Sequence, residues 1–393
     1  MALNKHALEQ RLEALSVSER EALRRRAGQL RDEARRQARA AKGGERRGSG
    51  RNTLPIWAIR LRDADLHLWV LRLLEDALVA ERPDGEHEAL TGRPAVVVWA
   101  GHKVCRVRLE GEEHEASLAG ELARSQRALM AVGDEVLIDG EAPNHRVLRV
   151  LPRRGVLSRP DPHNPHLERV IVSNIDVVIV VVAAKNPPLR PGLLDRYLVI
   201  IERGGASPLV CVNKMDLVAD EGARAALDGV LAPYEALGVP VLRCSASEGL
   251  GLGALAERVQ GRTTAFVGHS GVGKSSLVNA LFPGVDLGVG DVNAWHGKGR
   301  HTTTASSLVD LGGGTRLIDT PGVRALGLGQ LEHAELRWYF PEFLPFEDAC
   351  EYRDCTHDHE PRCGVRDAAA DGLISTRRLE SYHRLLHEAD GPG

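Results

Sequence analysis

The stretch Gly268-His269-Ser270-Gly271-Val272-Gly273-Lys274-Ser275 decides the fold, because it matches the phosphate-binding pattern G-x4-G-K-S. A strand is predicted directly before it, at Thr263–Val267, and a helix is predicted to begin at Lys274. In such a strand–loop–helix, backbone N–H groups and the helix N-terminus point at a bound anion. We therefore expect a nucleotide-binding α/β domain, with Lys274 at the β- and γ-phosphates and Ser275 on Mg²⁺.

A guanine-reading signature lies before this loop in the chain. It consists of Asn213-Lys214-Met215-Asp216 and, further on, Cys244-Ser245-Ala246-Ser247. The Asp216 carboxylate can accept hydrogen bonds from guanine N1–H and the exocyclic amine, a donor pair that adenine lacks. We expect Asn213 to brace the loop and the Lys214 stem to lie against the base. The main-chain N–H groups of Ser245 and Ala246 are expected to support the base.

The remaining nucleotide motifs follow the phosphate loop, so their order is rotated relative to an ordinary GTPase. Thr302-Thr303-Thr304 predicts a second Mg²⁺ ligand, Thr303, with Thr302 as the alternative. Asp319-Thr320-Pro321-Gly322 predicts an outer-sphere Mg²⁺ partner and an N–H group for the γ-phosphate. The predicted contacts to GTP are Asn213, Lys214, Asp216, Ser245, Ala246, Gly268, His269, Ser270, Gly271, Val272, Gly273, Lys274, Ser275, Ser276, Asp319 and Gly322.

Hydrolysis itself is predicted to be slow without help. Many GTPases carry a water-orienting glutamine directly after this glycine, whereas this chain has Val323, which cannot hydrogen-bond water. His301, beside the threonine run, is either the residue that positions the water or only a contact of the switch loop. We assign His301, Lys274 and Thr303 as the candidate catalytic residues. The glycine-containing residues 287–301 are predicted to form a switch loop ordered by the γ-phosphate.

The pattern of strands and helices predicts four regions: a basic extension at 1–90, a barrel at 91–160, a rotated GTPase domain at 161–330, and a metal-binding, mostly helical domain at 331–393. Short alternating strands from Gly92 to Leu157 favour an OB-type β-barrel, which either binds RNA or acts as a spacer. From about Pro160 the chain alternates strands and helices, which is typical of a doubly wound sheet.

Charge and apolar run length limit the kinds of partner that the sequence favours. The net charge is −3, so no overall basic field favours nucleic acid. The segment from Arg24 to Arg47 contains ten basic residues and three acidic ones, which predicts either a solvated arm or an RNA-contacting one. The longest apolar run, 177–184, is far shorter than the ~20 residues of a membrane span. We expect a cytoplasmic monomer that does not use a membrane.

Three cysteines and a histidine cluster near the C-terminus, as Cys350-x4-Cys355-x-His357-x5-Cys363. Four such ligands predict a closed tetrahedral site for one structural Zn²⁺, with His359 as the rival ligand. Reduced cysteines without a metal are the simpler alternative. Because the surrounding segment has little apolar core, metal binding would supply much of its folding free energy.

Taken together, the motif order, Gly299–Thr304, Asp319–Val323, the barrel and the Cys/His cluster resemble the circularly permuted ribosome small-subunit-dependent GTPases. The resemblance covers about residues 92–390. It implies GTP and Mg²⁺ as ligands, one zinc ion, the small ribosomal subunit and its rRNA as partner, and a role in late subunit maturation. It also implies that His301 acts when the ribosome stimulates hydrolysis. Residues 1–90 exceed the family's usual N-terminal tail, so nothing transfers to them.

Two other functions stay open from the sequence. One is a GTP-gated RNA-binding module in which hydrolysis is incidental. The other is a P-loop enzyme that uses ATP.

Overall fold

The computed structural model describes residues 92–101, 104–118, 130–160, 168–283, 306–319, 333–352 and 354–390. It also describes Leu326, Leu328 and Leu331, and five isolated positions in the first 30 residues. The chain forms two compact units, of which the larger contains Glu88–Glu235 and Val239–Leu331, and the smaller contains Glu332–Leu386. The four-domain division stays a prediction.

The first part of the larger unit is a closed five-stranded barrel. Its strands are β1 (Arg93–Ala100), β2 (Val104–Leu109), β3 (Glu112–Leu118), β4 (Glu135–Asp139) and β5 (His145–Val150). Each strand pairs with the next in the order β1-β2-β3-β5-β4, and β4 returns to β1. Only the β3–β5 pair is parallel. This is the connectivity of an OB-type barrel, which confirms the predicted class.

The barrel closes because alternate residues of its strands are apolar and face inward. Val97, Cys105, Val107, Val136 and Ile138 are fully buried in one cluster. Arg106 and Arg108 alternate with these residues on the outer face of β2. A two-stranded hairpin of β6 (Val156–Pro160) and β7 (Glu168–Ser173) follows the barrel. The sequence did not predict this hairpin.

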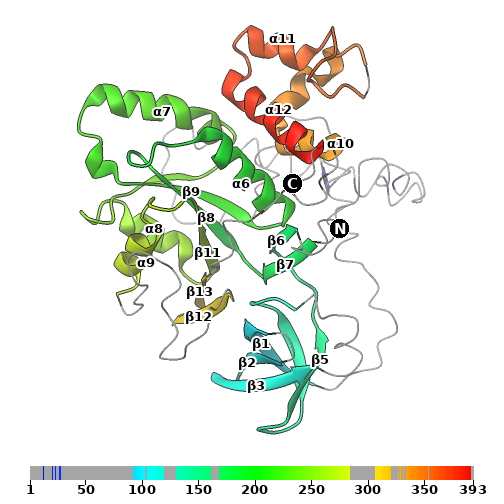
Figure 1. Ribbon diagram of the computed structural model, residues 1–393, viewed down its shortest axis with the longest axis vertical. Coiled ribbons are helices and arrows are strands. Elements are labelled where there is room, and N and C mark those ends of the chain that lie inside the picture. The colour runs from blue at the N-terminus through cyan, green and yellow to red at the C-terminus, as the bar shows by residue number, and fades with distance from the viewer. Residues whose placement is uncertain are drawn as a thin grey trace. The chain divides into compact units, whose positions relative to one another are not determined.

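A six-stranded, mostly parallel sheet forms the GTPase part of the larger unit (Figure 1). Its order is β10-β9-β8-β11-β13-β12, and only β12 runs antiparallel to its neighbour. The strands are β8 (Val177–Ala183), β9 (Ser207–Asn213), β10 (Val241–Arg243), β11 (Thr263–Val267), β12 (Ser307–Gly312) and β13 (Thr315–Asp319). β8 and β11 are neighbours although 79 residues separate Ala183 from Thr263 in the chain, so the sheet is wound in both directions from this pair.

Helices connect the parallel strands. They are α6 (Pro191–Arg203), α7 (Glu221–Ala236), α8 (Leu252–Val259) and α9 (Lys274–Leu281), with a 3₁₀ turn, η1, at Met215–Leu217. Leu255 of α8 and Leu277 of α9 pack with Ile179 and Val181 of β8, which are completely buried. The nearly continuous apolar residues of β8 and β9 reflect a sheet that is covered on both faces.

The smaller unit is built from short helices. These are α10 (His333–Leu336), the 3₁₀ segments η3 (Arg337–Tyr339) and η4 (Pro341–Ala349), α11 (Gly364–Ala370) and α12 (Thr376–Asp390). Phe340, Phe343 and Tyr382 form its core, with ring centroids 5.1 to 5.3 Å apart. Among the residues described, no helix is long and apolar enough to cross a membrane.

Candidate nucleotide and metal sites

The predicted nucleotide motifs meet at one edge of the sheet, where the parallel strands end. Asn213 ends β9, Val267 ends β11, and Asp319 ends β13. Ligands of doubly wound sheets bind beyond the carboxyl ends of the strands, near the point where the strand order reverses. Here that point lies between β8 and β11, directly beside the phosphate loop.

The phosphate loop requires glycine at its two ends. Gly268 has φ +142°, and a Cβ there would lie 2.2 Å from the carbonyl oxygen of Val181. Gly273 has φ +92°, and its Cβ would lie 2.3 Å from Asn213 Nδ2. The backbone therefore passes too close to its neighbours for any side chain. α9 begins at the next residue, Lys274, so the loop leads into a helix N-terminus as predicted.

Lys274 folds back over the loop that precedes it. Its Nζ donates hydrogen bonds to the carbonyl oxygens of Gly268, at 2.9 Å, and His269, at 3.0 Å. The ammonium group is thereby held above the backbone where a phosphate would be cradled. This arrangement concentrates positive charge at one end of the site.

The guanine motif is hydrogen-bonded directly to the phosphate loop, although Asn213 and Val272 are 59 positions apart in the chain. Asn213 is buried, and its Nδ2 donates to the carbonyl oxygen of Val272 at 3.0 Å. Its Oδ1 accepts a hydrogen bond of 3.1 Å from Ala246 N–H. Lys214 has φ +62°, and its Nζ donates to the carbonyl oxygen of Gly271 at 2.6 Å. One asparagine amide therefore joins three motifs that lie far apart in the sequence.

Ser245 acts on Asp216 through its side chain. The fully buried Ser245 Oγ donates to Asp216 Oδ1 at 2.6 Å, a charge-assisted hydrogen bond. Ser247 Oγ lies 3.0 Å from Ser245 Oγ. We expected the N–H groups of Ser245 and Ala246 to face the base, but they donate within the protein, to Leu250 O and Asn213 Oδ1. The hydroxyl group orients the carboxylate instead.

Not every predicted residue lies in the described part of the chain. His301, Thr302, Thr303, Gly322 and Val323 fall outside it, as do residues 287–301 of the predicted switch loop. The structure adds two contacts that the motifs did not indicate: the Ser247 hydroxyl, and the carbonyl oxygen of Asn186, which accepts a hydrogen bond from Lys214 Nζ. A carbonyl oxygen leaves no trace in a side-chain pattern.

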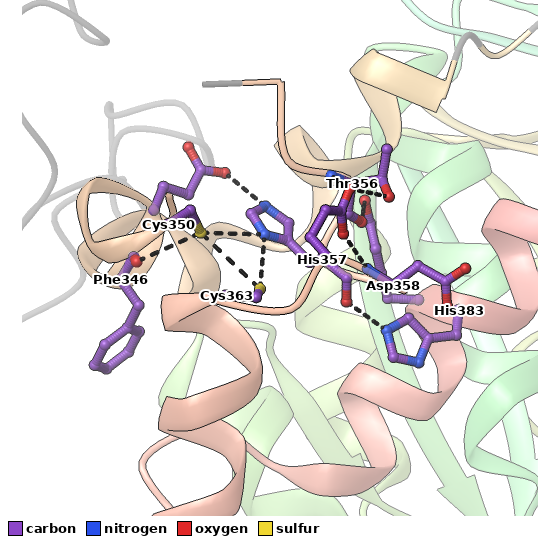
Figure 2. Close-up of polar contacts among 10 residues, drawn as sticks. Phe346, Cys350, Thr356, His357, Asp358, Cys363 and His383 are labelled. Carbon is purple, nitrogen blue, oxygen red and sulfur yellow. Dashed lines mark hydrogen bonds and ion pairs between the residues drawn. The ribbon is translucent and has the colours of Figure 1, made fainter. Parts of the chain in front are cut away.

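The four predicted metal ligands converge in the smaller unit. The ligand atoms of Cys350, Cys355, His357 and Cys363 all lie within 4.8 Å of one another. His357 Nδ1 is 3.6 Å from Cys350 Sγ and 3.4 Å from Cys363 Sγ, and the two sulfurs are 4.0 Å apart (Figure 2). A tetrahedron with Zn–S bonds of about 2.3 Å has edges of about 3.8 Å, so the donor set fits Zn²⁺.

The surroundings select His357 over His359. The His357 side chain is 1% exposed, and its Nε2 lies 3.6 Å from Glu347 Oε1, an outer carboxylate of the kind that orients metal-bound imidazoles. The His359 side chain is 80% exposed and lies beside Asp358. Burial raises the pKa of the Cys363 thiol, so a nearby cation is needed to keep it as the thiolate that binds metal.

Glu360 fixes the loop between the ligands. Burial acts to raise its pKa, but hydrogen bonds from the Thr356 N–H, the Thr356 hydroxyl and the Asp358 N–H lower that pKa to about 2. Tyr382 and His383 of α12 contact the carbonyl oxygens of Thr356 and His357, at 2.9 and 2.8 Å. The ligand loop is therefore held from two sides.

Comparison with known proteins agrees with this geometry. The RsgA GTPase family model matches residues 150–329. The small ribosomal subunit biogenesis GTPase RsgA of Gemmatimonas aurantiaca is 41% identical over 77% of this chain and 99% of its own length. Its counterpart from Azotobacter vinelandii is 40% identical, over 73% of this chain and 84% of its own.

Two solved structures are similar to about three quarters of the chain. YjeQ from Thermotoga maritima has a TM-score of 0.63 and 32% identity, covering 77% of this chain and all of its own. YloQ, described as a circularly permuted GTPase, has a TM-score of 0.59 and 27% identity over 78% of this chain. The rotated motif order, the shared fold and the extent of identity establish that this chain belongs to the RsgA family of circularly permuted GTPases.

Proposed function

We propose that this protein hydrolyses GTP in the late maturation of the small ribosomal subunit, and that the subunit stimulates the reaction. The observation that carries the proposal is the hydrogen bonding of Asn213 and Lys214 to the phosphate loop. It joins a base reader to a phosphate site in the rotated order of the family. The names of the relatives support the small subunit as the partner.

In this proposal each motif holds one part of the nucleotide. Asp216, oriented by Ser245, reads the guanine edge, and the Lys214 stem lies against the base. The N–H groups of residues 268–276 and Lys274 bind the phosphates. Ser275 and Thr303 bind Mg²⁺, with Asp319 as an outer-sphere partner and Gly322 N–H at the γ-phosphate.

Intrinsic turnover is proposed to be slow because Val323 cannot orient water. His301 would position the water once the subunit orders the switch loop. Activators of other GTPases accelerate hydrolysis by about 10³ to 10⁵, which sets the scale expected here. The rRNA of the subunit is the proposed contact, and a role in subunit maturation would place the protein in the cytoplasm. We propose that it acts there as a monomer.

We further propose that Cys350, Cys355, His357 and Cys363 bind one structural Zn²⁺. The support is the closed set of four donors, the buried His357 and its outer carboxylate, Glu347. Four protein ligands leave no open position for a reacting water, so the ion would stabilise the smaller unit without taking part in hydrolysis.

The test of nucleotide identity is Asp216→Asn. This change removes the acceptor pair for guanine and should weaken GTP binding while favouring xanthosine nucleotides. Binding is measured by fluorescence titration with labelled GDP, XDP and ADP. Unchanged GDP affinity in the variant, or ADP binding by the parent as tight as that of GDP, would contradict the assignment and favour an ATP-using enzyme.

A further inference from the structure

The barrel is joined to the GTPase part of the larger unit by a buried polar junction. Asp134, fully buried, accepts hydrogen bonds from Arg153 Nε at 2.7 Å and Arg153 Nη2 at 2.8 Å. The Ser173 hydroxyl donates to the same carboxylate at 2.6 Å. Ser173 ends β7, four residues before β8 begins. A satisfied buried network of this kind specifies one arrangement of its elements.

Main-chain contacts strengthen the junction. Val132 forms a bridge with Val172, and Ser173 N–H donates to the carbonyl oxygen of Val132 at 2.9 Å. The Asn174 side chain donates to the carbonyl oxygen of Gly133 at 2.9 Å. A Cβ on Gly133 would lie only 2.1 Å from the carbonyl oxygen of Ser173. The barrel is therefore packed tightly against the residues that lead into the sheet.

A second contact connects the barrel with strand β12. Trp99 of β1 pairs with Ser307, the first residue of β12. Arg108 of β2 places Nη1 3.3 Å from Asp310 Oδ2 of β12, while its Nη2 donates to Glu113 of β3 at 2.9 Å. Arg108 thus bridges two barrel strands and the GTPase sheet. Its side chain is 21% exposed, and that of Asp310 is 38% exposed.

Strand β12 connects this contact with the proposed magnesium residues. Ser307 lies four residues after Thr303, the proposed Mg²⁺ ligand, and pairs on its other side with Asp319 of β13. The barrel therefore meets the sheet at the strand that follows one proposed magnesium residue and lies beside another. A displacement of the barrel would therefore act on β12 before it acts on the rest of the sheet.

We propose that the Arg108–Asp310 contact is a brace through which RNA bound by the barrel controls GTP hydrolysis. Arg108 and Asp310 are positioning residues in this scheme, and neither touches the nucleotide. The inference rests on the proposed function, because it names the route by which the subunit stimulates turnover. An exposed ion pair contributes little by itself, so breaking it should change the stimulated rate by about two- to fivefold rather than abolish it.

The test compares Asp310→Arg with Asp228→Arg. Asp310→Arg places like charge against Arg108. Asp228→Arg is the matched control, since Asp228 is also exposed and paired, with Arg243 Nε at 3.1 Å, but belongs to α7, outside the barrel. Basal hydrolysis, GDP affinity and thermal unfolding establish that each variant is folded. Hydrolysis is then measured over a range of small-subunit concentrations.

The brace predicts that Asp310→Arg lowers kcat at saturating subunit about two- to fivefold, while basal kcat and the control variant stay at the parent values. If Asp310 only affected RNA binding, the result would differ. An added arginine attracts RNA, so kcat would stay unchanged and the subunit would bind equally well or more tightly. Equal saturated rates in the parent and in Asp310→Arg would overturn the inference, as would an equal fall in both variants.

A second measurement separates this inference from the proposed function. Hydrogen exchange of residues 104–109 is compared with GDP and with a non-hydrolysable GTP analogue, in the absence of ribosomes. The brace predicts a nucleotide-dependent difference in the parent that is reduced in Asp310→Arg. If subunits do not stimulate the parent, the proposed function fails. The hydrogen-exchange result by itself then shows whether Arg108 and Asp310 form the proposed brace. No nucleotide dependence in the parent would refute the brace.

Discussion

Removal of the Ser245 hydroxyl tests how the base reader is oriented. Ser245 Oγ donates to Asp216 Oδ1 at 2.6 Å from a fully buried position, so Ser245→Ala leaves the carboxylate without this donor. A hydrogen bond to a charged group contributes about 1.5–3 kcal/mol. Since about 1.36 kcal/mol corresponds to a factor of ten, GDP affinity should fall about 10- to 160-fold.

Ser247→Ala is the matched control for this change. Ser247 Oγ lies 3.0 Å from Ser245 Oγ and joins two neutral groups, for which a net contribution of about 0.5–1.5 kcal/mol is typical. Its loss should weaken GDP binding about two- to tenfold, clearly less than Ser245→Ala. Both dissociation constants are measured by fluorescence titration of labelled GDP. GDP affinity of Ser245→Ala within twofold of the parent would refute the proposed orientation of Asp216.

Three other changes test separate parts of the molecule. Gly273→Ala should abolish nucleotide binding, because residue 273 has φ +92° and the added Cβ would lie 2.3 Å from Asn213 Nδ2. Calorimetric titration with GDP measures this, and parental GDP affinity in the variant would contradict the prediction. Cys363→Ser should release the metal and unfold the smaller unit while GDP binding persists, because zinc binding contributes about 10–16 kcal/mol to the folding of such segments. Metal analysis measures bound zinc and circular dichroism measures folding; zinc retained by the variant would contradict the prediction. Glu360→Gln should lower the melting temperature at pH 7. A carboxylate whose pKa is depressed to about 2 from 4.5 stabilises the fold above pH 4.5 and loses that contribution as the pH falls towards 2, so the difference should vanish there; a constant difference would be contrary.

The sequence indicated where the candidate ligands lie because these residues belong to local motifs. The loop around Lys274 and the cluster from Cys350 to Cys363 contain their ligands within short stretches, and spacing alone indicates how these residues can meet. The OB-type barrel was also predictable, since short apolar strands are separated by turn residues and β2 alternates apolar residues with Arg106 and Arg108. In each case a short-range pattern determines the structure.

What the sequence did not indicate depends on non-local packing. The donor to Asp216 comes from Ser245, 29 residues away, and only the pairing of β9 with β10 brings the two together. The contact of Arg108 with Asp310 joins residues 202 positions apart. Arg106 and Arg108 of β2 both lie within 3.6 Å of Glu113 of β3. No periodicity in the sequence records such partners.

The proposed function depends on stimulation of GTP hydrolysis by the small subunit. The direct measurement is the rate of phosphate release by the pure protein alone, with small subunits, and with large subunits. We expect slow turnover alone, strong acceleration by small subunits, and none by large subunits. Equal rates under all three conditions would contradict the proposed function and favour a GTP-gated RNA-binding module in which hydrolysis is incidental.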